Sequence, residues 1–305
     1  MERLTGLGKA RSAKYKPLSM DRKRMIMKTE LNMGGMALSE EDYKEPRCPL
    51  SKPGQVSPIP TRRILEKLDE HLGRNDYLSA EKLLNYWLEE ATRGNDRRGK
   101  LTVLNEQIGL YRKMSKKPEG LQAIREALSL ADALHMDNTI TLGTTLINAA
   151  TGYNAFGMAE EALPLYREAQ RIYESVLDPE DSRLGGLYNN MALTVMAFGN
   201  YREAEELFGK ALHIMSTQEH GEAEMAITYC NLADLVCAEV GMTEGEARIE
   251  AYLNQAEQLL DTESLPRNGY YAFVCEKCAP AFGYYGYFLT EQELSERARE
   301  IYERS

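Results

Sequence analysis

The chain has 305 residues, of which 43% are hydrophobic and 28% are charged, as is ordinary for a soluble protein. No apolar run approaches the roughly 18 residues that a membrane span requires, and the basic N-terminus lacks the apolar stretch of a secretory signal. The net charge of −10 is uneven, because residues 1–30 carry nine Lys/Arg against three Asp/Glu, which leaves −16 for the remainder. Such an acidic body argues against nucleic acid as the main partner. The five cysteines lack the spacing of a small disulfide-rich domain, which favours reduced thiols and a cytoplasmic location.

Residues 1–58 show neither helical nor strand periodicity and are rich in Lys, Arg, Met, Gly, Ser and Pro. This composition predicts a basic, flexible arm and a Pro-rich linker ahead of a domain at 59–305. Met36 is a second candidate start of the chain. The sequence leaves open whether residues 1–35 are natively translated and whether they are ordered.

From Thr61 onward the apolar pattern is helical, and the sequence repeats itself with a period of about 42 residues. Segment 189–212 aligns with 147–170, and the dipeptide Phe-Gly recurs in register at 156–157 and 198–199. The alignment is anchored on a mostly large residue near the end of the first helix of each copy: His71, Tyr111, Tyr153, Val195, Val236 and Phe282. Three residues before each anchor stand Leu68, Ile108, Ala150, Ala192, Ala233 and Ala279. Residues at these spacings share one helix face, so the pattern predicts helix pairs that stack on one another.

This pattern resembles the tetratricopeptide repeat (TPR), closely over residues 188–212 and loosely over 75–88. The usual TPR period is about 34 residues, and the longer period here is similar to that of the kinesin-light-chain type. The resemblance covers roughly 60–305. It implies an all-α, right-handed superhelical solenoid of about six antiparallel helix pairs, with repeats at about 60–100, 101–142, 143–184, 185–225, 226–267 and 268–305. It also implies a concave groove that holds peptide segments, and no catalysis by the repeat itself.

The column five residues before the anchor places Asn148, Asn190 and Asn231 at one structural position in three successive copies. An Asn amide both donates and accepts hydrogen bonds, so a ladder of them could grip the backbone of a bound chain. Longer TPRs are known for such ladders, and the resemblance supports this interpretation. The alternative is that these side chains bond across helices within the protein, or to water. The neighbouring groove positions are neutral, small or mildly apolar: Thr144, Thr151, Asn154, Asn189, Leu193, Ile227 and Asp234.

This lining favours a neutral or apolar peptide, or a helix of a partner, over the acidic C-terminal tail that co-chaperone TPRs clamp. Only Arg112 and Lys113 resemble such a clamp. We therefore expect a protein- or peptide-binding scaffold or adaptor with no catalytic residue, no metal and no cofactor. One rival is a signalling-peptide sensor whose superhelix changes pitch on binding, and another has the basic arm occupying the groove. The partner, the oligomeric state and the form of the ligand, extended or helical, stay open.

A CxxC motif at Cys275 and Cys278 suggests a metal or redox protein as a further alternative. Both cysteines, however, fall in columns that other copies fill with core residues, so packing is the favoured interpretation. His71 is expected to be structural for the same reason. Cys230 and Cys237 fall on the groove lining, as small residues or as a reactive pair. The aromatic run 283–289 is expected to cap the last copy, with a stacking surface for a partner as the alternative.

Overall fold

The computed structural model describes residues 56–304, so most of the expectations for the N-terminal arm lie outside the described range. This range contains twelve α-helices and no strand, which confirms the all-α prediction. They form six successive pairs: α2 (Thr61–Gly73) with α3 (Tyr77–Arg93), α4 (Arg97–Lys113) with α5 (Lys117–Ala133), α6 (Ile140–Ala155) with α7 (Ala159–Val176), α8 (Ser182–Ala197) with α9 (Tyr201–Ser216), α10 (Glu222–Val240) with α11 (Met242–Leu260), and α12 (Gly269–Tyr284) with α13 (Phe288–Arg304). Within residues 56–304, every helix is too short or too polar to cross a membrane.

Short turns of defined chemistry join the two helices of each pair. After α8 ends at Ala197, Gly199 adopts a φ of +79°, and Gly157 has a φ of +75° at the same place in the preceding pair. Glycine accepts this left-handed conformation without a clash from a Cβ atom, which is why it often terminates helices. The repeated Phe-Gly dipeptide of the sequence is thus the turn of the helix pair.

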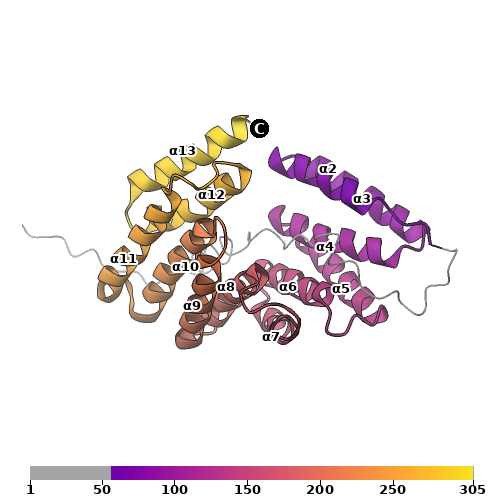
Figure 1. Cartoon of the computed structure of the whole chain (residues 1–305), viewed down its shortest axis with the longest axis horizontal. Coiled ribbons are helices and arrows are strands. Elements are labelled where there is room, and N and C mark those ends of the chain that lie inside the picture. Colours follow the sequence, from indigo (N-terminus) through magenta and orange to yellow (C-terminus); the bar gives the residue numbers. More distant parts are fainter. Residues whose placement is uncertain (1–55, 305) are drawn as a thin grey trace, which may run out of the picture.

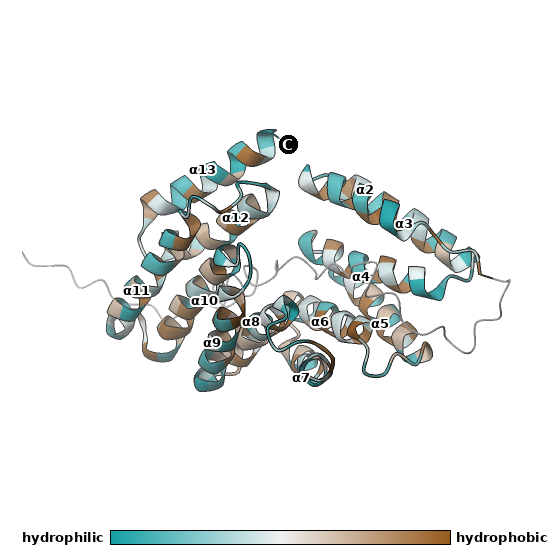
Figure 2. Cartoon of the chain, in the orientation of Figure 1, coloured by the Kyte–Doolittle hydropathy of each residue, from teal (hydrophilic) through white to brown (hydrophobic). Residues whose placement is uncertain are grey.

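The helices form two layers that curve together, as Figure 1 shows. From α4 onward the even-numbered helices follow one another along the inner side of the curve, where each contacts the next even-numbered helix. The odd-numbered helices pack on their outer side. Figure 2 shows broad hydrophilic stretches on the outer helices α9 and α13, as expected for faces in contact with water.

Small residues let the inner and outer layers approach closely, as the columns of the sequence predict. Ala150, Ala192 and Ala233 are fully buried, and so are the large side chains of Tyr166 and Phe208 on the outer helices α7 and α9. A small residue on one helix opposite a large one on the other fills the space between them at the density of a protein interior.

The fifth pair has the longest helices of the six pairs. Its helices α10 and α11 have 19 residues each, whereas α8 and α9 have 16. A single residue, Gly241 with a φ of +91°, joins them. Ala256 on α11 is fully buried, as are Ala169 on α7 and Ala211 on α9 to within 1% exposure.

The curve brings the first and last pairs of the solenoid near each other. Figure 1 shows the end of α13 close to α2. In addition, Lys113 Nζ on α4 lies 5.9 Å from the centroid of the Phe273 ring on α12, within the range of a cation–π contact. The inner face is therefore flanked by both ends of the described chain.

Candidate functional site

The residues expected in the groove lie on three neighbouring inner helices. Helix α6 carries Thr144, Asn148, Thr151 and Asn154, helix α8 carries Asn189, Asn190 and Leu193, and helix α10 carries Ile227, Asn231 and Asp234. Asn231 and Asp234 are partly buried and all the others are buried. Buried polar side chains need hydrogen-bond partners, so their partners decide what each of them does.

Two members of the asparagine ladder bond to the preceding repeat. Asn148 Nδ2 donates to Asn105 Oδ1 at 3.1 Å, and Asn231 Nδ2 donates to Asn189 Oδ1 at 3.1 Å. Thr228 Oγ1 also donates to Asn189 Oδ1, at 3.1 Å. These bonds tie successive inner helices together, which is the alternative that the sequence left open for this column.

The two groove threonines meet tyrosines of the outer layer. Thr144 Oγ1 lies 2.5 Å from the hydroxyl of Tyr173, and Thr151 Oγ1 lies 2.9 Å from that of Tyr166. Both tyrosines are fully buried on α7. The threonines therefore satisfy the polar ends of two core aromatic residues, as buried tyrosine hydroxyls require.

Asn154 and Asn190 differ from the rest of the set. The Oδ1 atom of each is buried and accepts no hydrogen bond from any residue of 56–304. The two lie in one neighbourhood, because Asn154 Nδ2 donates to Thr194 Oγ1 and Thr194 Oγ1 donates to the backbone oxygen of Asn190. Two buried acceptors on adjacent inner helices thus have no donor among residues 56–304.

Sequence reasoning missed Asn105 and Thr194, which complete these networks. Asn105 stands six residues before its anchor, the same column as Asn189, and both accept from an asparagine of the next repeat. The signal was an asparagine in the column beside the ladder. Thr194 gave no comparable signal, because threonine recurs on inner helices in packing roles.

Comparison with known proteins agrees with this geometry. Residues 185–221 match the family model described as tetratricopeptide repeat. The described chain has the fold of a TPR solenoid. No curated protein matches the sequence.

Solved structures similar to this TPR chain include proteins of several kinds. TPR-like repeats of a kinesin light chain from Podosopora anserina share 18% identity with a TM-score of 0.47, covering 66% of this chain and 94% of theirs. BtubC (BKLC) from P. vanneervenii shares 19% identity with a TM-score of 0.45, covering 80% and 91%. NprR in complex with its cognate peptide NprX shares 14% identity with a TM-score of 0.54, covering 78% of this chain and 66% of NprR. The likeness to NprR shows a common fold.

Several charged side chains of the protein lie on α4, near the first helix pair of the solenoid. Burial and then the carboxylate of Asp69 on α2 raise the pKa of Glu106 to about 7, while Lys113 acts in the opposite direction. Burial also lowers the pKa of Arg112 to about 10. Arg112 and Lys113 thus lie beside carboxyl groups and aromatic rings of the protein itself, Arg112 near Tyr166 and Lys113 near Phe273.

The CxxC residues belong to the hydrophobic core of the last two pairs. Cys275 and Cys278 are fully buried among apolar side chains, in agreement with the packing interpretation. Burial raises the pKa of Cys275 to about 11, and hydrogen bonding to Cys278, followed by burial, raises the pKa of Cys230 well above its ordinary value. High pKa values disfavour the thiolate that metal binding and disulfide chemistry need. Within residues 56–304, no cluster of His, Cys, Asp or Glu suits a metal ion.

Proposed function

We propose that this protein is a binding scaffold whose inner face takes up a neutral segment of a partner protein or peptide. The observation that carries the proposal is the pair of buried acceptors, Asn154 Oδ1 and Asn190 Oδ1, on adjacent inner helices. A buried acceptor without a donor costs a folded protein about 1–3 kcal/mol. A ligand that brings two N–H groups to this place removes that cost and gains the hydrogen bonds.

The chemistry of the two acceptors specifies the ligand in part. Carbonyl oxygens bind N–H donors such as those of a peptide backbone, and they repel a carboxylate. The other groove positions on α8 and α10 include the apolar Leu193 and Ile227, both buried. This combination favours an uncharged segment held by its backbone over the acidic tails that cationic TPR clamps bind.

A sensor of a short signalling peptide is the second candidate. It is favoured by the common fold with NprR, whose structure contains its cognate peptide NprX. The approach of the two ends of the solenoid, through Lys113 and Phe273, also suits a ligand that is enclosed on the inner face. A sensor would bind an isolated peptide and change its overall dimensions, whereas a scaffold would retain a folded partner without doing so.

Affinity purification with the wild type and with the double variant Asn154→Leu/Asn190→Leu tests the proposal. Leucine has nearly the shape of asparagine but no acceptor, so we expect the double variant to fold and to lose the partner. Gln170→Leu/Gln122→Leu, on the outer helices α7 and α5, is the matched control and should retain it. Identical partners for the wild type and the double variant would place binding elsewhere and refute the proposal.

A further inference from the structure

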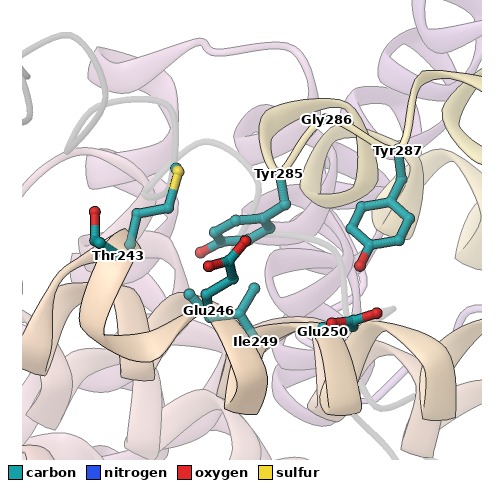
Figure 3. A pocket seen from close by; sticks show the side chains of 8 residues that line it. Thr243, Glu246, Ile249, Glu250, Tyr285, Gly286 and Tyr287 are labelled. Carbon is teal, nitrogen blue, oxygen red and sulfur yellow. The ribbon is translucent and has the colours of Figure 1, made fainter. Parts of the chain in front are cut away.

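A pocket of about 530 Å³ lies outside the inner face, between the start of α11 and the turn that joins α12 to α13. Figure 3 shows the rings of Tyr285 and Tyr287 extending from this turn toward α11. Glu246 and Glu250, one helical turn apart on α11, point back toward the rings, and Ile249 lies between them. The pocket therefore combines two aromatic walls, an apolar floor and two carboxylates.

The two carboxylates are not neutralised by the described part of the protein. Arg248 stands between them in the sequence, but it pairs with Glu205 at 2.9 Å and with Glu239 at 3.6 Å. Neither Glu246 nor Glu250 forms an ion pair or hydrogen bond with another residue of 56–304. Burial and the carboxylates of Glu250, Glu257 and Glu246 raise the pKa of Tyr287, which reflects the negative potential in the pocket.

The two residues that follow the pocket residue Tyr287 in the chain are large, apolar and exposed. Phe288 is 68% exposed and Leu289 is 79% exposed at the start of α13. The expected capping of the last repeat by residues 283–289 therefore fails for these two, because the helix start points them away from the core. Exposed large apolar residues beside a concave site are typical of an interaction surface.

The walls of the pocket are held in place. The Tyr285 hydroxyl donates to Asp234 Oδ1 at 2.7 Å and lies 3.2 Å from the backbone oxygen of Ala233. Gly286 has a φ of +90°, which turns the chain so that Tyr285 and Tyr287 both face α11. The position of the turn is thus fixed by the preceding helix pair.

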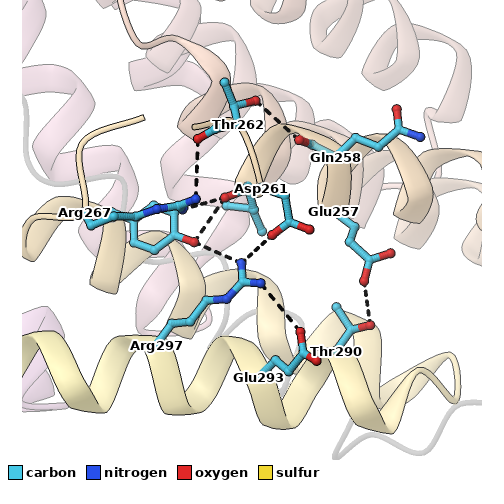
Figure 4. Close-up of polar contacts among 10 residues, drawn as sticks. Glu257, Gln258, Asp261, Thr262, Arg267, Thr290, Glu293 and Arg297 are labelled. Atoms are coloured by element: carbon cyan, nitrogen blue, oxygen red, sulfur yellow. Dashed lines mark hydrogen bonds and ion pairs between the residues drawn. The ribbon is translucent and has the colours of Figure 1, made fainter. Parts of the chain in front are cut away.

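A polar network anchors α13 to α11, as Figure 4 shows. Arg297 Nη1 on α13 lies 2.6 Å from Asp261 Oδ1, just after α11 ends, and donates to the Tyr271 hydroxyl at 3.1 Å. Thr290 Oγ1 donates to Glu257 Oε1 at 2.8 Å. The elements that form the pocket are therefore tied to one another, and such preorganisation lowers the entropic cost of binding.

We propose that this pocket is a second docking site, which takes a Lys or Arg side chain from an apolar segment of a protein partner. The two carboxylates bind the cation, and the tyrosine rings add cation–π attraction to it. Phe288 and Leu289 contact the apolar residues that flank the cation on the partner. The pocket lining contains none of the groove residues, although its Tyr285 bonds to Asp234 of that set, and the proposal does not depend on the function proposed for the inner face.

The test uses a capped peptide of sequence GLLRLG and the same peptide with citrulline in place of arginine, which removes the charge and keeps the shape. Binding to the full chain is followed by ¹H–¹⁵N NMR. We expect the arginine peptide to shift the amide signals of Gly245 and Gly286, and the citrulline peptide to bind at least about tenfold more weakly. Equal affinity of the two peptides, or shifts confined to α6 and α8, would overturn the proposal.

Variants separate the pocket from the acidic surface in general. Glu246→Gln/Glu250→Gln should weaken binding of the arginine peptide by about the same factor as citrulline does. Glu161→Gln/Glu168→Gln removes the same charge from exposed positions of α7 and should leave the affinity unchanged. Equal losses of affinity in both variants would mean that net charge alone, and not the pocket, explains the effect. If deletion of residues 1–35 by itself shifts the amide signal of Gly286, the occupant of the pocket is the chain's own basic arm and not a partner protein.

Discussion

Asn148 on α6 donates its side-chain amide to Asn105 Oδ1 on α4 at 3.1 Å, so this asparagine joins two successive repeats. Asn190 occupies the same column one repeat later, and its Oδ1 is buried without a donor from the described residues. The two side chains are almost equally buried, at 8% and 6% exposure. Equivalent positions in the sequence thus have different roles in the structure.

This difference predicts opposite effects on stability. Asn148→Ala leaves Asn105 Oδ1 without its donor and should lower the free energy of unfolding by about 1–3 kcal/mol. Asn190→Ala removes an acceptor that has no partner and should change it far less. Urea titration followed by circular dichroism compares the two variants directly. A loss for Asn190→Ala as large as that for Asn148→Ala would show that the column is structural throughout.

The repeat pattern was sufficient to predict the fold, because the packing of helix pairs depends on residue size at fixed spacings. The anchors and the residues three before them share one face of each inner helix. All six residues of that second column are buried, and the glycines of both Phe-Gly turns have a positive φ. The roles of individual asparagines could not be predicted in this way. Whether an amide bonds to a neighbouring repeat depends on the column beside it, and therefore on Asn105 and Asn189, which the alignment of one column does not include.

The last repeat shows a similar limit. The sequence favours a cap for residues 283–289, and the tyrosines do pack toward the preceding pair, but Phe288 and Leu289 are exposed. Their orientation depends on where α13 begins, and helix boundaries are the least certain part of a pattern. The pocket beside them depends on where α11 begins, because Glu246 and Glu250 lie in the first turns of this 19-residue helix.

Ala192 tests the packing of the two layers. It is fully buried on α8, where a larger side chain would force α8 and α9 apart. Ala192→Leu should lower the free energy of unfolding by about 1–3 kcal/mol, measured by urea titration. Ala197→Leu, at the exposed end of the same helix, is the control and should have little effect. Equal stability of the two variants would contradict close packing at this position.

The buried thiols should react only after unfolding. Cys275 and Cys278 are fully buried, and burial raises the pKa of Cys275 to about 11, so the thiolate is scarce at neutral pH. We expect iodoacetamide to leave both unmodified in the native protein and to modify both in urea, as read by peptide mass spectrometry. Rapid modification of either residue in the native state would favour the redox interpretation of the motif.

Glu106 predicts a dependence of stability on pH. Burial and then Asp69 raise its pKa to about 7 in the folded protein, against 4.5 for an ordinary glutamate, while Lys113 acts in the opposite direction. Between these values the folded state binds more protons than the unfolded state, so the free energy of unfolding falls as the pH rises. The loss is complete above the folded pKa, where Glu106 is charged in both states.

Replacement by glutamine isolates this contribution from those of other carboxyl groups. Glu106→Gln should be more stable than the wild type at about pH 8, and the advantage should disappear toward about pH 4, below the unfolded pKa. Urea midpoints of both proteins across this range provide the measurement. Asp69→Asn should also make the protein lose less stability as the pH rises, because it removes the neighbouring negative charge and favours ionised Glu106. A constant difference between the wild type and Glu106→Gln at every pH would mean that Glu106 does not titrate in this range, and its packing alone would then explain the change.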